Sequence, residues 1–134
     1  MKYASIDIGT NSCRLLIAEV RNSQLIVLKR DLETTRIGAG LAASGQISPE
    51  AAERTLQCLR RFQGEIDRCG VTDYRMVATS AVREASNRAW FEDLCLAQLH
   101  KEVEVISWEK EAFLTYNGVQ KGLRAERPPL VVDL

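Results

Sequence analysis

The stretch from Ala4 to Ala18 constrains this fold more than any other part of the sequence, because a short polar segment separates two apolar ones. Residues 2–8 alternate and then run apolar, and residues 13–20 are again largely apolar, which predicts two buried strands. Gly9 to Asn11 form the turn between them, since glycine and asparagine tolerate the positive φ of a tight hairpin. The sequence therefore opens with an antiparallel hairpin whose tip carries a carboxylate and hydroxyls.

The rest of the chain alternates between strand and helix patterns. Ser48-Pro49-Glu50 predicts the start of a helix, with serine as N-cap and proline in the first turn, and Gly70 marks its end. Other patterns indicate one strand that begins with residues 25–28 and further strands at 74–79, at 103–106 and from residue 130. They also indicate helices at 88–101 and 107–122, a helical turn at 80–84 and an irregular loop at 33–47. Three antiparallel strands followed by alternating helices and parallel strands predict an α/β fold, a mixed sheet with helices on its faces.

Two helices show which residues form the core. The first has an apolar stripe at spacings of three and four, made of Ala52, Leu56, Leu59, Phe62 and Ile66. In the second we expect burial of Trp90, Phe91, Leu94 and Ala97. Met76 and the other aromatic side chains are likewise expected in the core.

Composition narrows the class of protein. With 46% apolar residues the chain can bury a substantial core, and 18 basic against 18 acidic residues argue against a general nucleic-acid or membrane binder. No apolar stretch approaches the roughly 18 residues that span a bilayer. The four cysteines form no Cys-x-x-Cys pair, so we expect reduced thiols and a cytoplasmic protein, and a single histidine excludes a histidine-rich zinc site.

The turn Asp7–Ser12 offers the donors that a phosphate group needs. Its backbone N–H groups and hydroxyls predict phosphate-binding roles for Gly9, Thr10, Asn11 and Ser12. Asp7 would repel a phosphate unless a divalent cation lay between them, so the motif implies Mg²⁺. The alternative is an ordinary hairpin turn, which such a sequence also suits.

Two further clusters contain arginines. Arg36, in a glycine-rich loop, either reaches a phosphate or is a solvated surface residue. Thr79 and Ser80 follow a strand, and Arg83 follows one turn later. They either orient a ligand and neutralise a transferring phosphoryl group, or serve as a helix cap and a surface residue.

Glu109 and Glu111 begin a helix after the strand at 103–106. Acids are favoured at helix starts by the dipole, so capping is one interpretation. A general base that activates water is the other. Spacing alone does not choose between the two glutamates. The carboxyl ends of parallel strands meet at one sheet edge, so we expect these residues, Asp7–Ser12 and Thr79–Arg83 to lie there together.

Four segments in register resemble one family. They are Asp7–Ser12, Thr35–Leu41, Ala78–Asn87 and Glu111-Ala112 with Gly118-Val119. Together they are similar to the N-terminal domain of the exopolyphosphatase / guanosine pentaphosphate phosphatase family. The resemblance implies a ribonuclease-H-like domain of the actin-like superfamily, with a second similar domain facing it.

The resemblance also implies an activity. The family removes the terminal phosphate of inorganic polyphosphate or of guanosine pentaphosphate, using Mg²⁺ and water. The phosphate-contacting arginine of the family maps onto Arg83, and the glutamate held to activate water maps onto Glu111 rather than Glu109. Trp108 departs from the glycine that is frequent in the family at this position, which bears on access beside Glu111.

The resemblance further places the start of a second phosphate loop at Asp133, which we expect to be a second metal ligand. Residues 1–134 would then be one N-terminal domain of a two-domain phosphatase, ending before that loop, and nearly inactive alone. We expect the full-length protein to be a homodimer. Two alternatives stay open: an ATP-dependent small-molecule kinase of the same superfold, and a non-catalytic regulator that binds guanosine penta- or tetraphosphate.

Overall fold

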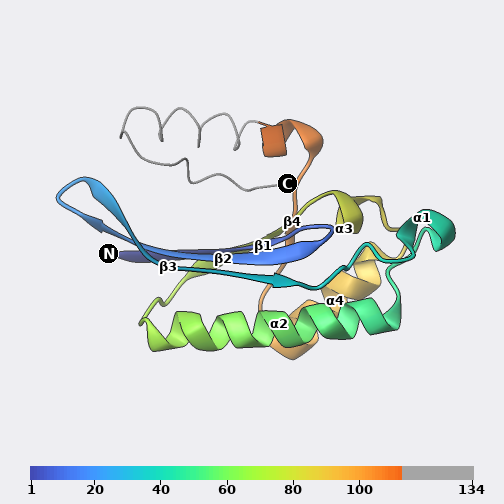
Figure 1. Cartoon of the computed structure of the whole chain (residues 1–134), viewed down its shortest axis with the longest axis horizontal. Helices are drawn as coiled ribbons and strands as arrows, with labels where there is room; N and C mark the ends of the chain where they lie inside the picture. Colours follow the sequence, from blue (N-terminus) through green and yellow to red (C-terminus); the bar gives the residue numbers. More distant parts are fainter. Residues whose placement is uncertain (113–134) are drawn as a thin grey trace.

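The computed structural model describes residues 1–112 as a single sheet with its main helices on one face (Figure 1). The strands are β1 (Lys2–Ile8), β2 (Ser12–Arg21), β3 (Gln24–Thr34), β4 (Tyr74–Ala78) and β5 (Glu104–Val105). The helices are α1 (Leu41–Ser44), α2 (Pro49–Arg68), α3 (Ser80–Glu84) and α4 (Arg88–Leu99), and residues 108–112 are also helical. The expected strand from residue 130, and most of the helix expected at 107–122, lie outside the described residues.

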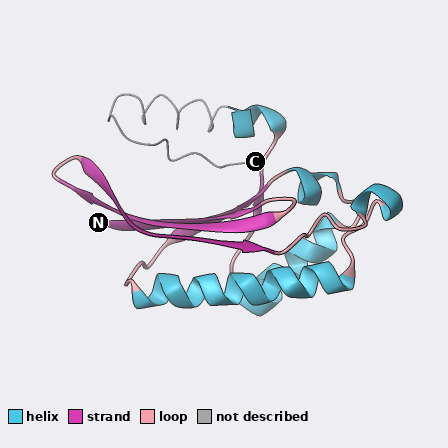
Figure 2. Cartoon of the chain, viewed as in Figure 1, coloured by secondary structure: helices cyan, strands magenta, loops and turns pink. Residues whose placement is uncertain are grey.

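The sheet is mixed, as predicted. Its order is β3-β2-β1-β4-β5, with β2 antiparallel to both β1 and β3, and β4 parallel to both β1 and β5. Figure 2 shows α2 and α4 on the same face of this sheet. The carboxyl ends of β1, β4 and β5 therefore meet at one edge, which is where the polar clusters were expected.

The positive φ expected in the turn from Gly9 to Asn11 is found in a different turn. Gly9 and Asn11 do not have positive φ; instead Asn22 and Ser23, between β2 and β3, have φ of 51° and 63°. Two consecutive left-handed residues match the twist of a two-residue hairpin. Gly9 is needed for a different reason: a Cβ at this position would lie 3.0 Å from the carbonyl oxygen of Ser12.

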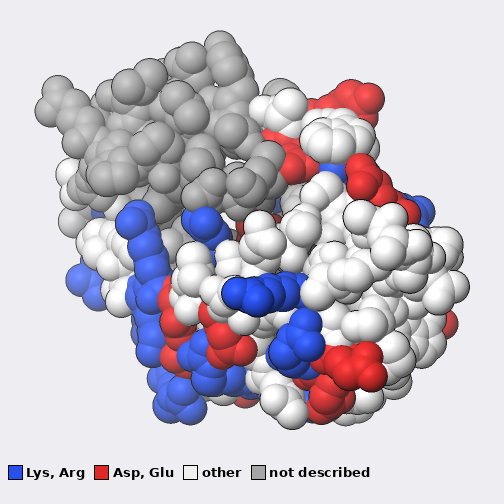
Figure 3. Space-filling view, turned by 45° about the vertical axis from the view of Figure 1, so that its right-hand side comes forward, with Lys and Arg blue, Asp and Glu red and all other residues white. Residues whose placement is uncertain are grey.

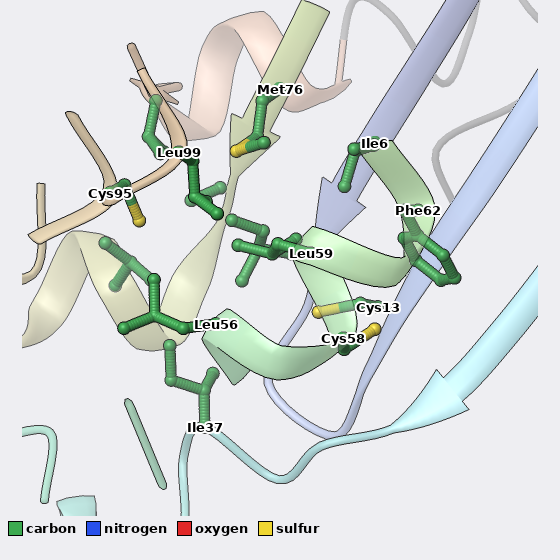
Figure 4. Close-up of a cluster of buried hydrophobic side chains, with 14 of the residues drawn as sticks. Ile6, Cys13, Ile37, Leu56, Cys58, Leu59, Phe62, Met76, Cys95 and Leu99 are labelled. Atoms are coloured by element: carbon green, nitrogen blue, oxygen red, sulfur yellow. The ribbon is translucent and has the colours of Figure 1, made fainter. Parts of the chain in front are cut away.

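Helix α2 forms for the reasons read from its sequence. The Ser48 hydroxyl accepts a hydrogen bond from the amide of Ala51 at 3.1 Å, and Gly70 takes a φ of 75° just past the helix end. Its predicted apolar stripe is buried against β1 and β2, which Figure 4 shows for Leu56, Leu59 and Phe62. Removing the Phe62 ring would cost about 3–5 kcal/mol in stability.

Helix α4 buries only part of the predicted stripe, with Phe91 buried and Leu94 half-buried as expected. Phe91, Cys95 and Leu99 are buried, whereas Trp90 is 38% exposed and Ala97 is exposed. The three buried residues are four apart, so they lie on one face, and a face that includes Trp90 and Ala97 points away from α2. The expectation that all aromatic side chains lie in the core is also wrong, since Tyr3 and Trp108 are 50% and 59% exposed to solvent.

The four cysteines are free, as expected, and three of them are buried. Burial raises the pKa of the Cys95 thiol to about 12. A hydrogen bond with Cys13, together with burial, raises the pKa of Cys58 further. Figure 4 shows these sulfurs within the apolar cluster, so they act as small core residues rather than as nucleophiles.

Charged side chains of both signs are interspersed on the face shown in Figure 3. One group joins α2 to the outer strand: Arg61 pairs with Asp31 at 2.6 Å and with Glu33 at 2.8 Å. The hydrogen bond from Arg61 holds the pKa of Asp31 below its usual value. Within residues 1–112, no helix is both long and apolar enough to cross a membrane.

Candidate active site

The predicted clusters meet at the carboxyl edge of the parallel strands. Backbone hydrogen bonds continue the sheet into this edge, from the Thr79 amide to Ile8 O at 3.3 Å and from the Ile106 amide to Ala78 O at 3.1 Å. The loops that follow β1, β4 and β5 are thus fixed side by side. Placement of the site depends on these pairings, because the three loops are far apart along the chain.

A hydroxyl pair joins the first two loops. The side-chain oxygens of Thr10 and Ser80 lie 2.8 Å apart, and either one can donate. Thr79, the residue before Ser80, is 3% exposed. The structure therefore brings together three of the residues predicted to bind phosphate.

The amides of the first turn are not equivalent. The Gly9 amide donates to Ser12 O at 3.0 Å, so it serves the turn itself. Within the part of the chain that the structure describes, the amides of Thr10 and Asn11 donate to no acceptor. These two N–H groups are the ones left for an anion, together with the hydroxyls of Thr10 and Ser12.

The loop after β3 holds the first turn in place through backbone hydrogen bonds. The amides of Thr35 and Arg36 both donate to Asn11 O, at 3.1 and 3.0 Å, and the Gly38 amide donates to Thr10 O at 3.1 Å. A Cβ on Gly38 would lie 2.6 Å from Thr10 Cγ2, so only glycine fits this approach. This contact explains why a glycine-rich loop accompanies the turn.

Arg36 lies at the surface of this loop. Its backbone is left-handed, with a φ of 52°, and its side chain is exposed, with no hydrogen bond or ion pair among residues 1–112. The sequence reading missed Arg54, whose guanidinium donates to Thr35 O at 3.0 Å and to Arg36 O at 3.3 Å. Arg54 lies on the predicted helix, and no local signal linked it to the loop.

Arg83 and Glu111 form a buried ion pair beside the hydroxyls. Arg83 Nη1 donates to Glu111 Oε2 at 2.9 Å and to Ile106 O at 2.9 Å. The two side chains are 12% and 3% exposed. Their proximity removes the interpretation of Arg83 as a solvated surface residue.

The two glutamates are also separated by the structure. Ser107 caps the helix, accepting from the Lys110 amide at 3.1 Å, and Glu109 in its first turn is exposed. Glu111 is turned inward toward Arg83. Glu109 therefore fits the capping interpretation, and Glu111 is the glutamate that lies in the site.

One edge of the Arg83 guanidinium makes no hydrogen bond to the described residues. Its Nε and Nη2 are buried, and neither has a hydrogen-bond partner among the described residues. Buried donors left unsatisfied cost about 1–3 kcal/mol each. Two parallel N–H groups on one edge suit a bidentate contact with a phosphoryl group, which would satisfy both.

A second finding at Arg83 was not predicted. The Trp108 ring lies over the guanidinium, with 4.1 Å from the guanidinium carbon to the ring centroid. The sequence marked Trp108 only as a departure from a resemblance. Its contact depends on the packing of the strand β5 and the following helix against α3.

Asp7 fits a magnesium ligand in position and burial. It lies on β1 opposite Val77 of β4, one strand residue before the turn, and is 7% exposed. Residues 1–112 contain no cluster of three or more His, Cys, Asp or Glu side chains able to hold a metal. Mg²⁺ is commonly held by one or two carboxylates plus substrate phosphates and water, so a single buried carboxylate such as Asp7 is compatible with such a site. Asp133 lies outside the described residues.

Comparison with known proteins identifies the family of this chain. A model of the Ppx/GppA phosphatase family matches residues 16–134. A bifunctional 3-dehydroquinate synthase/phosphatase from Fusobacterium nucleatum is 38% identical over 123 residues, covering 87% of this chain and 18% of the relative. The chain thus spans less than a fifth of that relative.

Solved structures give the same picture. The Aquifex aeolicus member of the Ppx/GppA family superposes with a TM-score of 0.88 at 32% identity, over 92% of this chain and 40% of that one. An exopolyphosphatase from Cytophaga hutchinsonii gives 0.87 at 33% identity, over 90% and 39%. The ethanolamine utilization protein EutJ from Carboxydothermus hydrogenoformans, 12% identical with a TM-score of 0.55, shares the fold alone. The predicted α/β fold with a mixed sheet is confirmed, and the chain belongs to the Ppx/GppA phosphatase family.

Proposed function

We propose that this chain is the N-terminal domain of a two-domain, Mg²⁺-dependent hydrolase that removes the terminal phosphate of inorganic polyphosphate or of guanosine pentaphosphate. The observation that carries the proposal is Arg83, which is bonded to Glu111 at 2.9 Å and keeps a buried edge of two donors without a partner among the described residues. Family membership supports a phosphatase, and relatives described as exopolyphosphatases support a polyphosphate substrate.

The first turn would bind the terminal phosphoryl group. The amides of Thr10 and Asn11 and the hydroxyls of Thr10, Ser12 and Ser80 supply donors, and none of them brings charge. Arg83 adds the positive charge through Nε and Nη2. Arg36, exposed on the neighbouring loop, is retained as an outer phosphate contact.

Arg83 and Glu111 would have different roles in the reaction. Because Arg83 occupies Glu111 Oε2, the other oxygen of Glu111 is left to accept a proton from the attacking water. The water oxygen bonds to the terminal phosphorus as the bridging P–O bond breaks, and the shortened chain leaves with that oxygen. Arg83 stabilises charge on the phosphoryl oxygens in the transition state.

Asp7, with Asp133 as a second ligand, is proposed to hold Mg²⁺. When bound, the ion would offset the charge of the phosphate oxygens next to these carboxylates. A carboxylate so near a phosphate-binding turn would repel the phosphate unless a divalent cation lay between them, which supports this assignment. Asp7→Asn should therefore raise the Mg²⁺ concentration that gives half-maximal activity.

The test uses the whole protein with polyphosphate and guanosine pentaphosphate in parallel, measuring released phosphate with Mg²⁺ and with excess chelator. Release that needs Mg²⁺ supports the proposal, and the ratio of kcat/KM identifies the preferred substrate. ATP consumption that requires a small acceptor molecule would instead indicate the kinase. Tight nucleotide binding without phosphate release would indicate the non-catalytic regulator.

Three properties of the whole protein remain part of the proposal. Residues 1–134 alone should release little phosphate, because only one half of the clamp is present. A cytoplasmic location is supported by four free thiols. A homodimer, which sedimentation would measure, is the expected assembly.

A further inference from the structure

Trp108 holds an unusual position for a large aromatic side chain, because it borders the buried ion pair and is itself 59% exposed. Its ring lies over the guanidinium of Arg83, at 4.1 Å from the guanidinium carbon to the centroid. Of the three cation–aromatic contacts in the described part of the chain this is the shortest, the others being 4.5 and 5.0 Å. An exposed tryptophan in this place therefore has a specific partner.

The contacts of Arg83 are unevenly distributed. Both of its hydrogen bonds leave from Nη1, to Ile106 O and to Glu111 Oε2. Bonds from one nitrogen fix one end of the guanidinium and leave its plane free to tilt about that end. A ring over the face removes this freedom, since tilting would lose the cation–π contact.

We propose that Trp108 is a positioning residue that fixes the plane of the Arg83 guanidinium, so that Nε and Nη2 present a flat, two-pronged edge to a phosphoryl group. The inference rests on the proposed function, in which this edge binds phosphate. Trp108 touches Arg83 and acts through it. It also covers that face from water, which keeps the Arg83–Glu111 contact in a low dielectric.

The geometry sets which substitutions are informative. Trp108→Leu keeps apolar bulk and removes the π face, whereas Trp108→Phe keeps a weaker π face. A cation–π contact at an exposed site is worth about a two- to five-fold change in affinity. Leucine should therefore weaken phosphate binding about two- to five-fold, and phenylalanine should restore most of the loss.

The experiment follows Trp108 directly in the whole protein labelled with 5-fluorotryptophan. The fluorine resonance of Trp108 is identified by its loss in Trp108→Phe, and that of Trp90, on α4, serves as the internal control. Titration with inorganic phosphate should move the Trp108 signal saturably and leave the Trp90 signal in place. In Arg83→Met the Trp108 signal should no longer respond to phosphate.

Binding and hydrolysis are then compared across the variants. If phosphate does not move the Trp108 signal, or if Trp108→Leu binds phosphate as tightly as wild type, the inference is overturned. This holds even where the wild type releases phosphate. A phosphate-dependent Trp108 signal in a protein that hydrolyses neither substrate supports the inference and overturns the proposed hydrolysis. Absence of both the signal and the hydrolysis overturns both.

Discussion

Thr10 and Ser80 share a hydrogen bond of 2.8 Å between their hydroxyls, although 70 residues separate them in sequence. The bond joins the turn after β1 to the start of α3. It is made possible by the parallel pairing of β1 with β4, which places Ile8 opposite Ala78. The two segments predicted to contact phosphate therefore lie side by side.

Removing this hydroxyl pair should lower stability and disturb the turn. Thr10→Val and Ser80→Ala should each destabilise the protein by about 0.5–1.5 kcal/mol, and the double variant should cost less than the sum of the two. Urea denaturation of the four proteins measures this cycle. Ser5→Ala, at an exposed position on β1, is the control and should change little. Strict additivity would show that the two hydroxyls do not interact in solution.

Glu111 and Glu109 form a matched pair for the catalytic assignment. Glu111→Gln should reduce phosphate release by the whole protein about 10²-fold or more, because amide oxygen cannot take the proton from water. Glu109→Gln, exposed on the same helix, should stay close to wild type. Phosphate release under saturating substrate measures both. Equal rates for Glu111→Gln and wild type would remove Glu111 from its proposed role.

Two glycines should respond to alanine with opposite signs. Gly38→Ala places a methyl group 2.6 Å from Thr10 Cγ2, so overpacking should cost about 1–3 kcal/mol. Gly64 lies inside α2, where an added Cβ meets only the end of the Arg68 side chain at 3.4 Å. Gly64→Ala should therefore stabilise the protein by about 0.5–1 kcal/mol. Thermal unfolding compares the two, and a stabilising Gly38→Ala would contradict the close approach of the loop.

The ion pair of Asp31 and Arg61 should make stability depend on pH in the acid range. The hydrogen bond from Arg61 lowers the pKa of Asp31 in the folded state. The pair's contribution is therefore complete above the ordinary aspartate pKa of about 4 and is lost as the pH falls through the lower, folded value.

Urea midpoints of wild type and Asp31→Asn should accordingly differ at pH 7 and converge as the pH approaches 2. Added salt should reduce the difference at pH 7, since the pair is partly solvated. Asp93→Asn is the control, because Asp93 is exposed and has no ion pair among residues 1–112. A difference between wild type and Asp31→Asn that persists unchanged at pH 2 would assign the effect to packing.

Local sequence patterns determined most of the elements and their class. The apolar runs around the first turn, the Ser48-Pro49 helix start and the stripe of α2 depend on neighbours a few residues apart, and all three appear as predicted. Patterns failed where burial depends on a partner element. In α4 the burial of Phe91 was predicted, but Cys95 and Leu99 were missed, because only the packing of the helix in the fold selects them over Trp90 and Ala97.

The sequence by itself therefore determined which kinds of side chain follow each parallel strand, and that a polar turn separates the first two strands. Tertiary structure alone decided which of them meet. In the folded chain Glu111 points inward and Glu109 is exposed, and the Gly9 amide donates its hydrogen bond within the turn. The ring of Trp108 lies over the guanidinium of Arg83. The physical reason is that periodicity records a residue's own strand or helix, whereas a site is made by hydrogen bonds and contacts between strand ends whose order in space is set by the pairing of the sheet.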